Sequence, residues 1–242
     1  MLDLAITGFT LAFLALGFRK PFLWVLAYLY IDTLGPQKIS YHLLASMSIS
    51  LVAFVLAFGG WLVLDDKRDS RFTMRQGIIA VLLVYCGVTT MFADFPVEAM
   101  DKWSWVWKAL VFAIFLPLTL RTRLRIEAAA LVMVLSIGAI IIDGGIKTVG
   151  GGGGYGTLHL FINDNVGLYE GSIISSVAIA VIPLIVWLMK HGTIFPPDWR
   201  VRMFGAALIF ACALIPVGTQ ARTGLVCLAL LAVMALRTVK WR

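Results

Sequence analysis

The sequence predicts an all-α integral membrane protein with about nine transmembrane helices. Of its 242 residues, 61% are hydrophobic and 14% are charged, whereas soluble domains have roughly half and a quarter. The apolar residues fall in blocks of roughly 17 to 25 residues, a length that crosses a bilayer as a helix. The basic residues stand in short clusters between these blocks. This distribution favours a membrane protein over a nucleic-acid-binding protein, which would need one continuous basic surface.

Nine apolar segments follow one another along the chain. The first lacks the basic start and small-residue end of a cleavable signal peptide, and Asp32 and Gly35-Pro36 interrupt the second. The fifth begins among tryptophans, and a very tight connection joins the eighth to the ninth. We expect one transmembrane domain over residues 1–242, with a weaker first subregion at 1–76 and a motif-bearing region at 121–242. The expected spans are residues 2–18, 21–35, 42–64, 77–93, 103–120, 128–148, 168–189, 203–218 and 220–237.

The loops alternate in charge, and this alternation predicts the orientation of the chain. Of the 20 Lys and Arg residues, 15 fall in one set of alternate connections and 5 in the other. Because basic residues stay in the cytoplasm, the first set faces inward and the second faces the periplasm or exterior. The N-terminus is then outside and the C-terminus inside. Trp103, Trp105, Trp107 and Tyr155 suit an outer interfacial belt, in which simple anchoring is their plainest role.

The cysteines and histidines show no pattern of a metal or cofactor site. Cys86, Cys212 and Cys227 lie inside apolar blocks, without paired or metal-ligand spacing. The three histidines are dispersed, and each is expected in a loop or at an interface. His159 lies on the outer side and stays a candidate. We expect no metal and no cofactor.

A run of five glycines, Gly150–Gly154, is the single low-complexity segment of the chain. A phosphate-binding P-loop requires Gly-Lys followed by Ser or Thr after a strand, but Ile146 separates Gly145 from Lys147. The predicted topology also places the run outside, away from cytoplasmic nucleotides. Because glycine lets another chain or a ligand approach closely, the run is either an outer hinge or substrate-facing loop, or a merely flexible connection.

Polar residues gather just before the seventh predicted span, in the stretch FINDNVGLYEGS at 161–172. Asn163, Asp164 and Asn165 stand where short polar side chains cap a helix N-terminus. A helix cap explains at least one of these three residues. It does not readily explain all three together with Glu170, which follows about one and a half turns later. Groups of this kind at a membrane face bind sugar hydroxyls or act as a general base. Capping and a functional role therefore both stay open.

The connection PVGTQARTGL at 216–225 is so tight that Arg222 falls in the first turn of the ninth span. A charged residue near membrane depth costs at least about 2.5 kcal/mol on insertion scales and indicates a functional site. Arginine binds phosphate in a bidentate manner, and a helix N-terminus favours anions. Thr219, Gln220 and Thr223 add hydrogen-bond donors. Snorkelling of Arg222 to the lipid headgroups is the alternative.

Several motifs stand in a characteristic order. They are FRKPFLWVLAYLYIDTLGPQKISY, FADFPVEAMDKWSWVWK, RTRLRIEA at 121–128, DGGIKTVGGGGGYG at 143–156, FINDNVGLYEGS and GTQARTGLVCLALLAV. In this order they resemble the O-antigen ligase and polymerase superfamily, and more narrowly the O-glycosylation ligases associated with exosortase systems. The resemblance covers nearly the whole chain. It depends on the order of the motifs, since none of them is as specific as a zinc signature.

The resemblance implies a polytopic enzyme of the bacterial inner membrane with a GT-C-like helical bundle. Such an enzyme takes a glycan from undecaprenyl pyrophosphate on the periplasmic side. It transfers the glycan to lipid A core, a polysaccharide or a protein hydroxyl. The arginine that holds the pyrophosphate in that superfamily matches Arg222, and an asparagine at a helix entrance matches Asn165. The implied partners are this donor, its acceptor and membrane lipids, but no nucleic acid.

The residues divide into two expected roles. Positioned cations can stabilise the leaving pyrophosphate without a metal, and Arg222 is expected to do so, with Lys147 as a weaker helper. Asp164 is the expected general base, followed by Glu170 and His159. The expected substrate-binding residues are Lys147, Asn163, Asn165, Thr219, Gln220, Arg222 and Thr223.

The sequence also departs from the superfamily pattern. The motif reads Ala221-Arg222-Thr223-Gly224 where the superfamily has Ser-Arg-Gly. Other members are longer and carry a periplasmic loop with a functionally important histidine beyond this motif, so the chain is expected to be the N-terminal part of a longer member. A carrier or flippase-like transporter of lipid-linked sugars would bind the same headgroup without chemistry. A non-catalytic membrane subunit is the third alternative.

Overall fold

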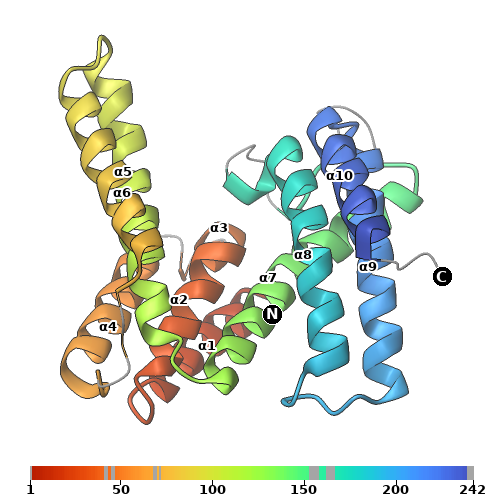
Figure 1. The fold of residues 1–242 in the computed structure, drawn as a ribbon, viewed down its shortest axis with the longest axis horizontal. Helices are drawn as coiled ribbons and strands as arrows, with labels where there is room; N and C mark the ends of the chain where they lie inside the picture. Colours follow the sequence, from red (N-terminus) through yellow and green to blue (C-terminus); the bar gives the residue numbers. More distant parts are fainter. Residues whose placement is uncertain are drawn as a thin grey trace.

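The computed structural model describes residues 2–40, 43–44, 47–67, 70, 72–152, 158–161 and 167–238. In these ranges the chain forms α-helices and one short 3₁₀ helix, η1, without any strand, which confirms the all-α class (Figure 1). In order, they are α1 (Leu2–Leu16), α2 (Phe22–Leu34), α3 (Pro36–Ile39), α4 (Ile49–Leu64), α5 (Met74–Met91), α6 (Pro96–Thr119), α7 (Arg123–Val149), η1 (Gly167–Tyr169), α8 (Gly171–His191), α9 (Trp199–Thr219) and α10 (Arg222–Thr238).

Each of the nine predicted apolar segments overlaps one of these helices. The third and fifth differ most: α4 begins at Ile49, seven residues after the predicted start at 42, and α6 begins at Pro96, seven residues before the predicted start at 103. The expected interruption of the second segment is confirmed: α2 ends at Leu34, Gly35 has a φ of 62°, and Pro36 begins the short helix α3. A positive φ ends a helix and is easily adopted only by glycine. The sequence did not predict α3.

The expected number of nine spans is not reached. Within the described ranges, four helices are long and apolar enough to cross a membrane, namely α5, α7, α8 and α9. The helices α1, α2, α4 and α10 have between 13 and 17 residues, or about 20 to 26 Å at 1.5 Å per residue, against a bilayer core of about 30 Å. The 24-residue helix α6 carries Glu98, Asp101, Lys102 and Lys108. The protein is therefore a helical membrane protein. The number of helices that qualify as spans is below nine because α1, α2, α4 and α10 are short and because α6 is charged.

Two hydrophobic cores share the long helix α7. The first joins α1, α2, α4 and α6 to the beginning of α7 and includes Tyr28 and Phe112. The second joins the rest of α7 to α8 and α9 and includes Ile140 and Ile215. Because α7 is one continuous helix, it holds the two groups together (Figure 1).

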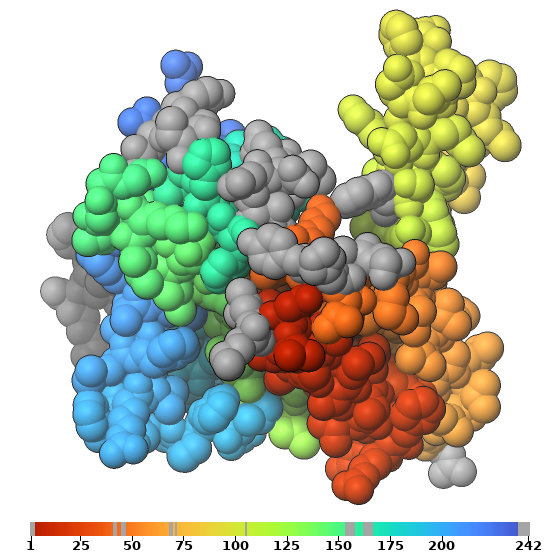
Figure 2. Space-filling view, turned by 180° about the vertical axis from the view of Figure 1, so that it is seen from behind, coloured from red at the N-terminus to blue at the C-terminus, as the bar shows by residue number. Residues whose placement is uncertain are grey.

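The helices α5 and α6 form a hairpin that projects from the rest of the protein as an arm (Figures 1 and 2). In the apolar stretch of α5 only 6% of residues are buried, and Val81, Val84 and Tyr85 are exposed. Trp103 and Trp107 of α6 line a cavity of about 550 Å³ against α5. These two tryptophans thus pack between helices, in addition to any role in an interfacial belt.

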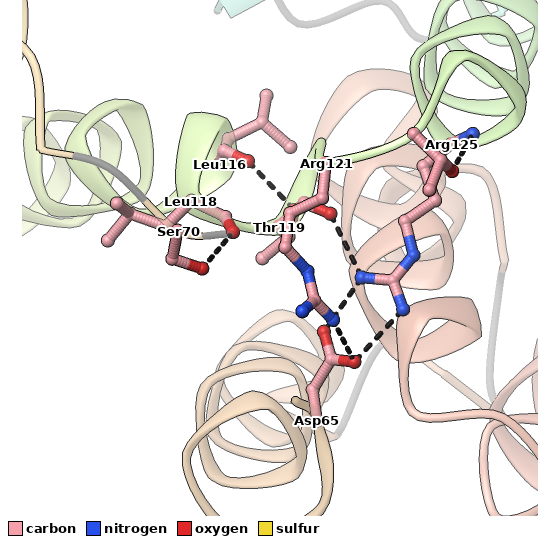
Figure 3. A network of polar contacts seen from close by, with 8 residues as sticks. Asp65, Ser70, Leu116, Leu118, Thr119, Arg121 and Arg125 are labelled. Carbon is pink, nitrogen blue, oxygen red and sulfur yellow. Dashed lines mark hydrogen bonds and ion pairs between the residues drawn. The ribbon is translucent and has the colours of Figure 1, made fainter. Parts of the chain in front are cut away.

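The connections with many basic residues gather at one end of the bundle, the lower end in Figure 1. There Asp65, just after α4, forms ion pairs with Arg121 and Arg125, each at 2.7 Å (Figure 3). Burial raises the pKa of the Asp65 carboxyl, but the hydrogen bond from Arg125 and the charges of both arginines outweigh burial and hold it below its ordinary value. The network joins the end of α4 to the α6–α7 connection.

A second contact at this basic end fixes the α8–α9 loop. Glu127 of α7 is buried, and its carboxylate accepts hydrogen bonds from the Thr193 hydroxyl, at 2.7 Å, and from the backbone N–H groups of Thr193 and Ile194. Arg123 donates to the carbonyl of His191 at 2.9 Å. The basic connections that the charge pattern assigns to one side of the membrane therefore lie at one end of the bundle.

Candidate functional site

The candidate residues lie at the other end of the bundle, where α7 and α9 end and α8 and α10 begin. Close helix contacts hold this end together. A Cβ atom added to Gly224 of α10 would lie 2.6 Å from the Cβ of Ser175 and 3.0 Å from the ring of Pro216. Only glycine fits there without displacing α8 or α9. The glycine of the Ala221-Arg222-Thr223-Gly224 motif is thus a packing position.

Arg222 is the first residue of α10 and is exposed. No acidic side chain in the described ranges forms an ion pair with it. The partial positive charge of a helix N-terminus adds to the guanidinium charge and favours an anion at this position. The neighbouring Thr223 is also exposed, and its hydroxyl donates a long hydrogen bond of 3.4 Å to the carbonyl of Ser172 in α8. The predicted cation is therefore presented to the surroundings next to the start of α8.

Thr219 and Gln220, which precede Arg222 by three and two positions, differ in their surroundings. The Thr219 side chain is buried, and its hydroxyl lies 2.6 Å from the Ser175 hydroxyl and 2.9 Å from the Ile215 carbonyl. Thr219 thus joins α9 to α8, and its substrate contact stays a prediction. Gln220 is exposed and has a φ of 53°, the one positive φ among the described non-glycine residues. Such backbone strain often marks a functional position.

Lys147 and His159 are brought together near the end of α7. The Lys147 ammonium forms an ion pair with Asp143 at 2.9 Å and donates to the backbone carbonyl of His159 at 2.8 Å. The His159 side chain is exposed. Asp143 partly balances the charge of Lys147, which leaves Lys147 a weaker anion site than Arg222. Sequence reasoning missed Asp143, although an acid four residues before a lysine on a helix is a recognised pairing pattern.

Glu170 is the N-cap residue of α8, which begins at Gly171. Its carboxylate accepts a hydrogen bond of 2.6 Å from the Ser172 hydroxyl. The interpretation of Asn163, Asp164 and Asn165 as caps of this helix is wrong, because η1 with its positive φ at Gly167 intervenes. These three residues lie outside the described ranges, so their roles as general base and sugar ligands stay predictions.

The start of the glycine run ends α7. The N–H of Gly150 donates to the Ile146 carbonyl at 2.9 Å, and the N–H of Gly152 donates to the Lys147 carbonyl at 2.8 Å. Gly151 between them has a φ of 82°. Glycines in this conformation satisfy the last free carbonyls of a helix. The run therefore begins as a C-terminal cap, which is more specific than a flexible connection, while Gly153 and Gly154 lie outside the described ranges.

The arrangement can bind an anion and move a proton. Arg222 offers an exposed cation at a helix N-terminus, and Thr223 offers a hydroxyl next to it. Glu170 and His159 are titratable groups at the same end of the bundle. In the described part of the chain, no three His, Cys, Asp or Glu side chains are grouped to hold a metal ion.

A family model described as a family of unknown function (DUF5935) matches residues 1–193. The matched region includes α1 to α8, and with them Lys147, His159 and Glu170. Arg222 and α10 follow the matched region. No curated protein and no solved structure matches the chain.

Proposed function

The chain belongs to this family, DUF5935, and we propose that it is a membrane glycosyltransferase similar to the O-antigen and O-glycosylation ligases. In this proposal it takes a glycan from undecaprenyl pyrophosphate at the periplasmic face of a bacterial inner membrane and attaches it to a lipid or protein hydroxyl. The observation that carries the proposal is the exposed Arg222 at the start of α10, held beside the start of α8 by Thr223 and the close contact at Gly224.

The proposed mechanism separates leaving-group stabilisation from proton transfer. A pyrophosphate that departs from the sugar gains negative charge, and a fixed cation at that position lowers the barrier. The guanidinium of Arg222 matches this requirement because it is exposed and lacks a described acidic partner. Asp164, Glu170 and His159 are the candidates that accept the proton from the acceptor hydroxyl. Of these, Glu170 has a carboxylate already oriented by Ser172.

The proposal includes a GT-C-like bundle in which the shorter apolar helices also cross the bilayer. Short hydrophobic helices are accommodated by local thinning of the bilayer at modest cost. Cysteine labelling tests the orientation in a background without the three native cysteines. From outside intact cells, Asp94→Cys at the tip of the α5–α6 hairpin should be labelled, and Lys67→Cys after α4 should not. The reverse pattern would place Arg222 in the cytoplasm and refute the proposed donor site.

Transfer can be measured with the full-length protein in proteoliposomes that contain undecaprenyl-pyrophosphate-linked glycan and an acceptor. We expect glycosylated acceptor together with released undecaprenyl pyrophosphate. Movement of the donor across the bilayer without transfer would instead identify a carrier. If neither product nor movement is observed, the non-catalytic subunit is favoured.

Variants of Arg222 test the role of the cation. Arg222→Ala should slow transfer by about 100-fold, the lower range for loss of one group that stabilises developing negative charge. Arg222→Lys should retain part of the rate, since it keeps the charge but loses the bidentate fork. Arg19→Ala, at the opposite end of the bundle, is the matched control and should transfer normally. A normal rate for Arg222→Ala would rule out its contact with the pyrophosphate.

A further inference from the structure

A cavity of about 290 Å³ lies between α7, α8 and α9 at the basic end of the bundle, opposite Arg222. Its walls are mostly apolar and include Leu131 and Val134 of α7, Leu188 of α8 and Leu208 of α9. The volume is close to the lower limit of small-ligand sites. It suits a slender apolar group better than a bulky one.

The mouth of this cavity is also apolar. Leu135 of α7, Ile194 and Phe195 of the α8–α9 loop and Phe204 of α9 line it, and their exposed fractions range from 37% to 52%. Two of the helices involved, α7 and α9, are long and apolar enough to cross a membrane. Large exposed apolar groups on such helices face lipid. An occupant therefore enters from the bilayer and not from water.

Two charged residues line the cavity, and they are placed differently. Glu127 uses both carboxylate oxygens to bind the backbone and hydroxyl of the α8–α9 loop, so its charge is already compensated by hydrogen bonds. Arg200 is exposed and lies beside the Trp199 ring, at 5.8 Å from its centroid. No acidic side chain in the described ranges forms an ion pair with Arg200.

The α8–α9 connection and its flanking helix ends carry more basic than acidic residues. Arg123 and Lys190 are also exposed at this end of the bundle. Asp198 is the acidic residue nearest in sequence, and its carboxylate accepts a hydrogen bond of 2.7 Å from the N–H of Trp199 as the N-cap of α9. The carboxylates of Asp198 and Glu127 are thus engaged by hydrogen bonds, whereas the exposed Arg200 lines the cavity. An anion is favoured at the rim, directly beside an apolar cavity.

We propose that this cavity is a binding site for an anionic phospholipid, with one acyl chain between α7, α8 and α9 and the phosphate at Arg200. A neutral lipid would match the apolar walls but not the cation, and free phosphate would match the cation but not the walls. Basic pockets between membrane helices are known to bind anionic headgroups. The site lies at the end of the bundle away from Arg222, and it does not depend on the proposed glycosyl transfer.

Native mass spectrometry of the detergent-purified full-length protein tests this site with phosphatidylglycerol and phosphatidylcholine at equal concentration. The wild type should retain phosphatidylglycerol preferentially. Arg200→Ala should reduce that preference by about fivefold, the effect of one cationic side chain near an anionic lipid. Arg202→Ala removes an equal charge from the same helix but from outside the cavity lining, and it should retain the preference.

A second pair of variants tests the acyl-chain groove itself. Val201→Trp fills the cavity and should reduce retention of both lipids. If Val201→Trp does not purify as a monodisperse protein, Leu135→Trp at the mouth of the cavity replaces it. The proposal is overturned if Arg200→Ala and Arg202→Ala lose the preference for phosphatidylglycerol equally. Their positive charge would then attract the lipid without a specific binding site. It is also overturned if retention is unchanged when the groove is filled, or if inorganic phosphate at millimolar concentration displaces the lipid.

Discussion

Replacing Gly224 by alanine tests the helix contact that presents Arg222. The added Cβ would lie 2.6 Å from the Ser175 Cβ and 3.0 Å from the Pro216 ring. Neither neighbour can rotate away, because a Cβ atom and a proline ring are fixed to their own backbones. Helix α10 must therefore move away from α8 and α9, which would also displace Arg222 at its first turn.

The size of the effect follows from two opposing contributions. An extra methyl group in a packed contact costs about 1 to 3 kcal/mol, whereas glycine to alanine within a helix gains about 1 kcal/mol. Gly59 of α4 is the matched control, because a Cβ there has no heavy atom within 4 Å. Gly59→Ala should thus gain about 1 kcal/mol, and Gly224→Ala should be neutral or lose up to about 2 kcal/mol. The difference between the two variants isolates the cost of the clash.

Thermal unfolding in one detergent and at one scan rate measures this difference. For a chain of this size, 1 kcal/mol corresponds to roughly 2 to 4 °C in the unfolding midpoint, so a difference of about 2 kcal/mol gives roughly 4 to 8 °C. Gly224→Ala should also slow the proposed glycan transfer, and Gly59→Ala should not. If Gly224→Ala raises the midpoint as much as Gly59→Ala does, the close contact of α10 with α8 and α9 does not exist.

Three further changes test the polar contacts. Asp65→Asn should lower the free energy of unfolding by about 2 kcal/mol, because two arginines lose a charged hydrogen-bond partner. The folded-state pKa of Asp65 lies below its ordinary 3.8. The difference in free energy of unfolding between the wild type and Asp65→Asn should therefore be complete well above pH 3.8 and shrink as pH falls through the folded-state pKa. A difference in unfolding midpoint that stays constant from pH 7 to pH 3 would contradict this. Tyr169→Phe removes the 2.5 Å hydrogen bond to the Leu34 carbonyl and should lower the free energy of unfolding by about 1 kcal/mol. The loss should be seen as faster amide exchange at the end of α2. Unchanged exchange would mean that the bond does not hold these segments together. Gln220→Gly removes the strain of a φ of 53° and should raise the unfolding midpoint. It should also lower the proposed glycan transfer, and a normal rate would exclude a substrate contact by this side chain.

The helical segments could be predicted because each depends on local hydropathy. In a bilayer a single apolar segment forms a helix because its backbone polar groups must be satisfied within the segment. The break at Gly35-Pro36 follows from backbone geometry alone. The ends were less predictable where a cap decides them. The start of α8 at Gly171 depends on η1 and Glu170, and the polar residues at 163–165 gave a misleading signal.

The charges of the candidate site were predictable, but their partners were predictable only where the contact is local. Arg222 and Lys147 stand out as basic residues near apolar segments. The pairing of Lys147 with Asp143 is a contact within α7 that the four-residue spacing indicates. That Arg222 has no acidic partner among the described residues depends on how the helices pack. The contact between Thr219 and Ser175 joins residues 44 positions apart, and no local pattern indicates it.

The sequence by itself determined the membrane class, the order of the helices and the two groups of alternate connections, because hydropathy and charge act on each segment separately. Only the tertiary structure decided which helix ends meet. It placed Gly224 against Ser175 and Pro216, and it closed Glu127 onto the α8–α9 loop beside the cavity at Arg200. These contacts join distant parts of the chain, and they form only when side-chain shape and hydrogen bonding are satisfied on several helices at once.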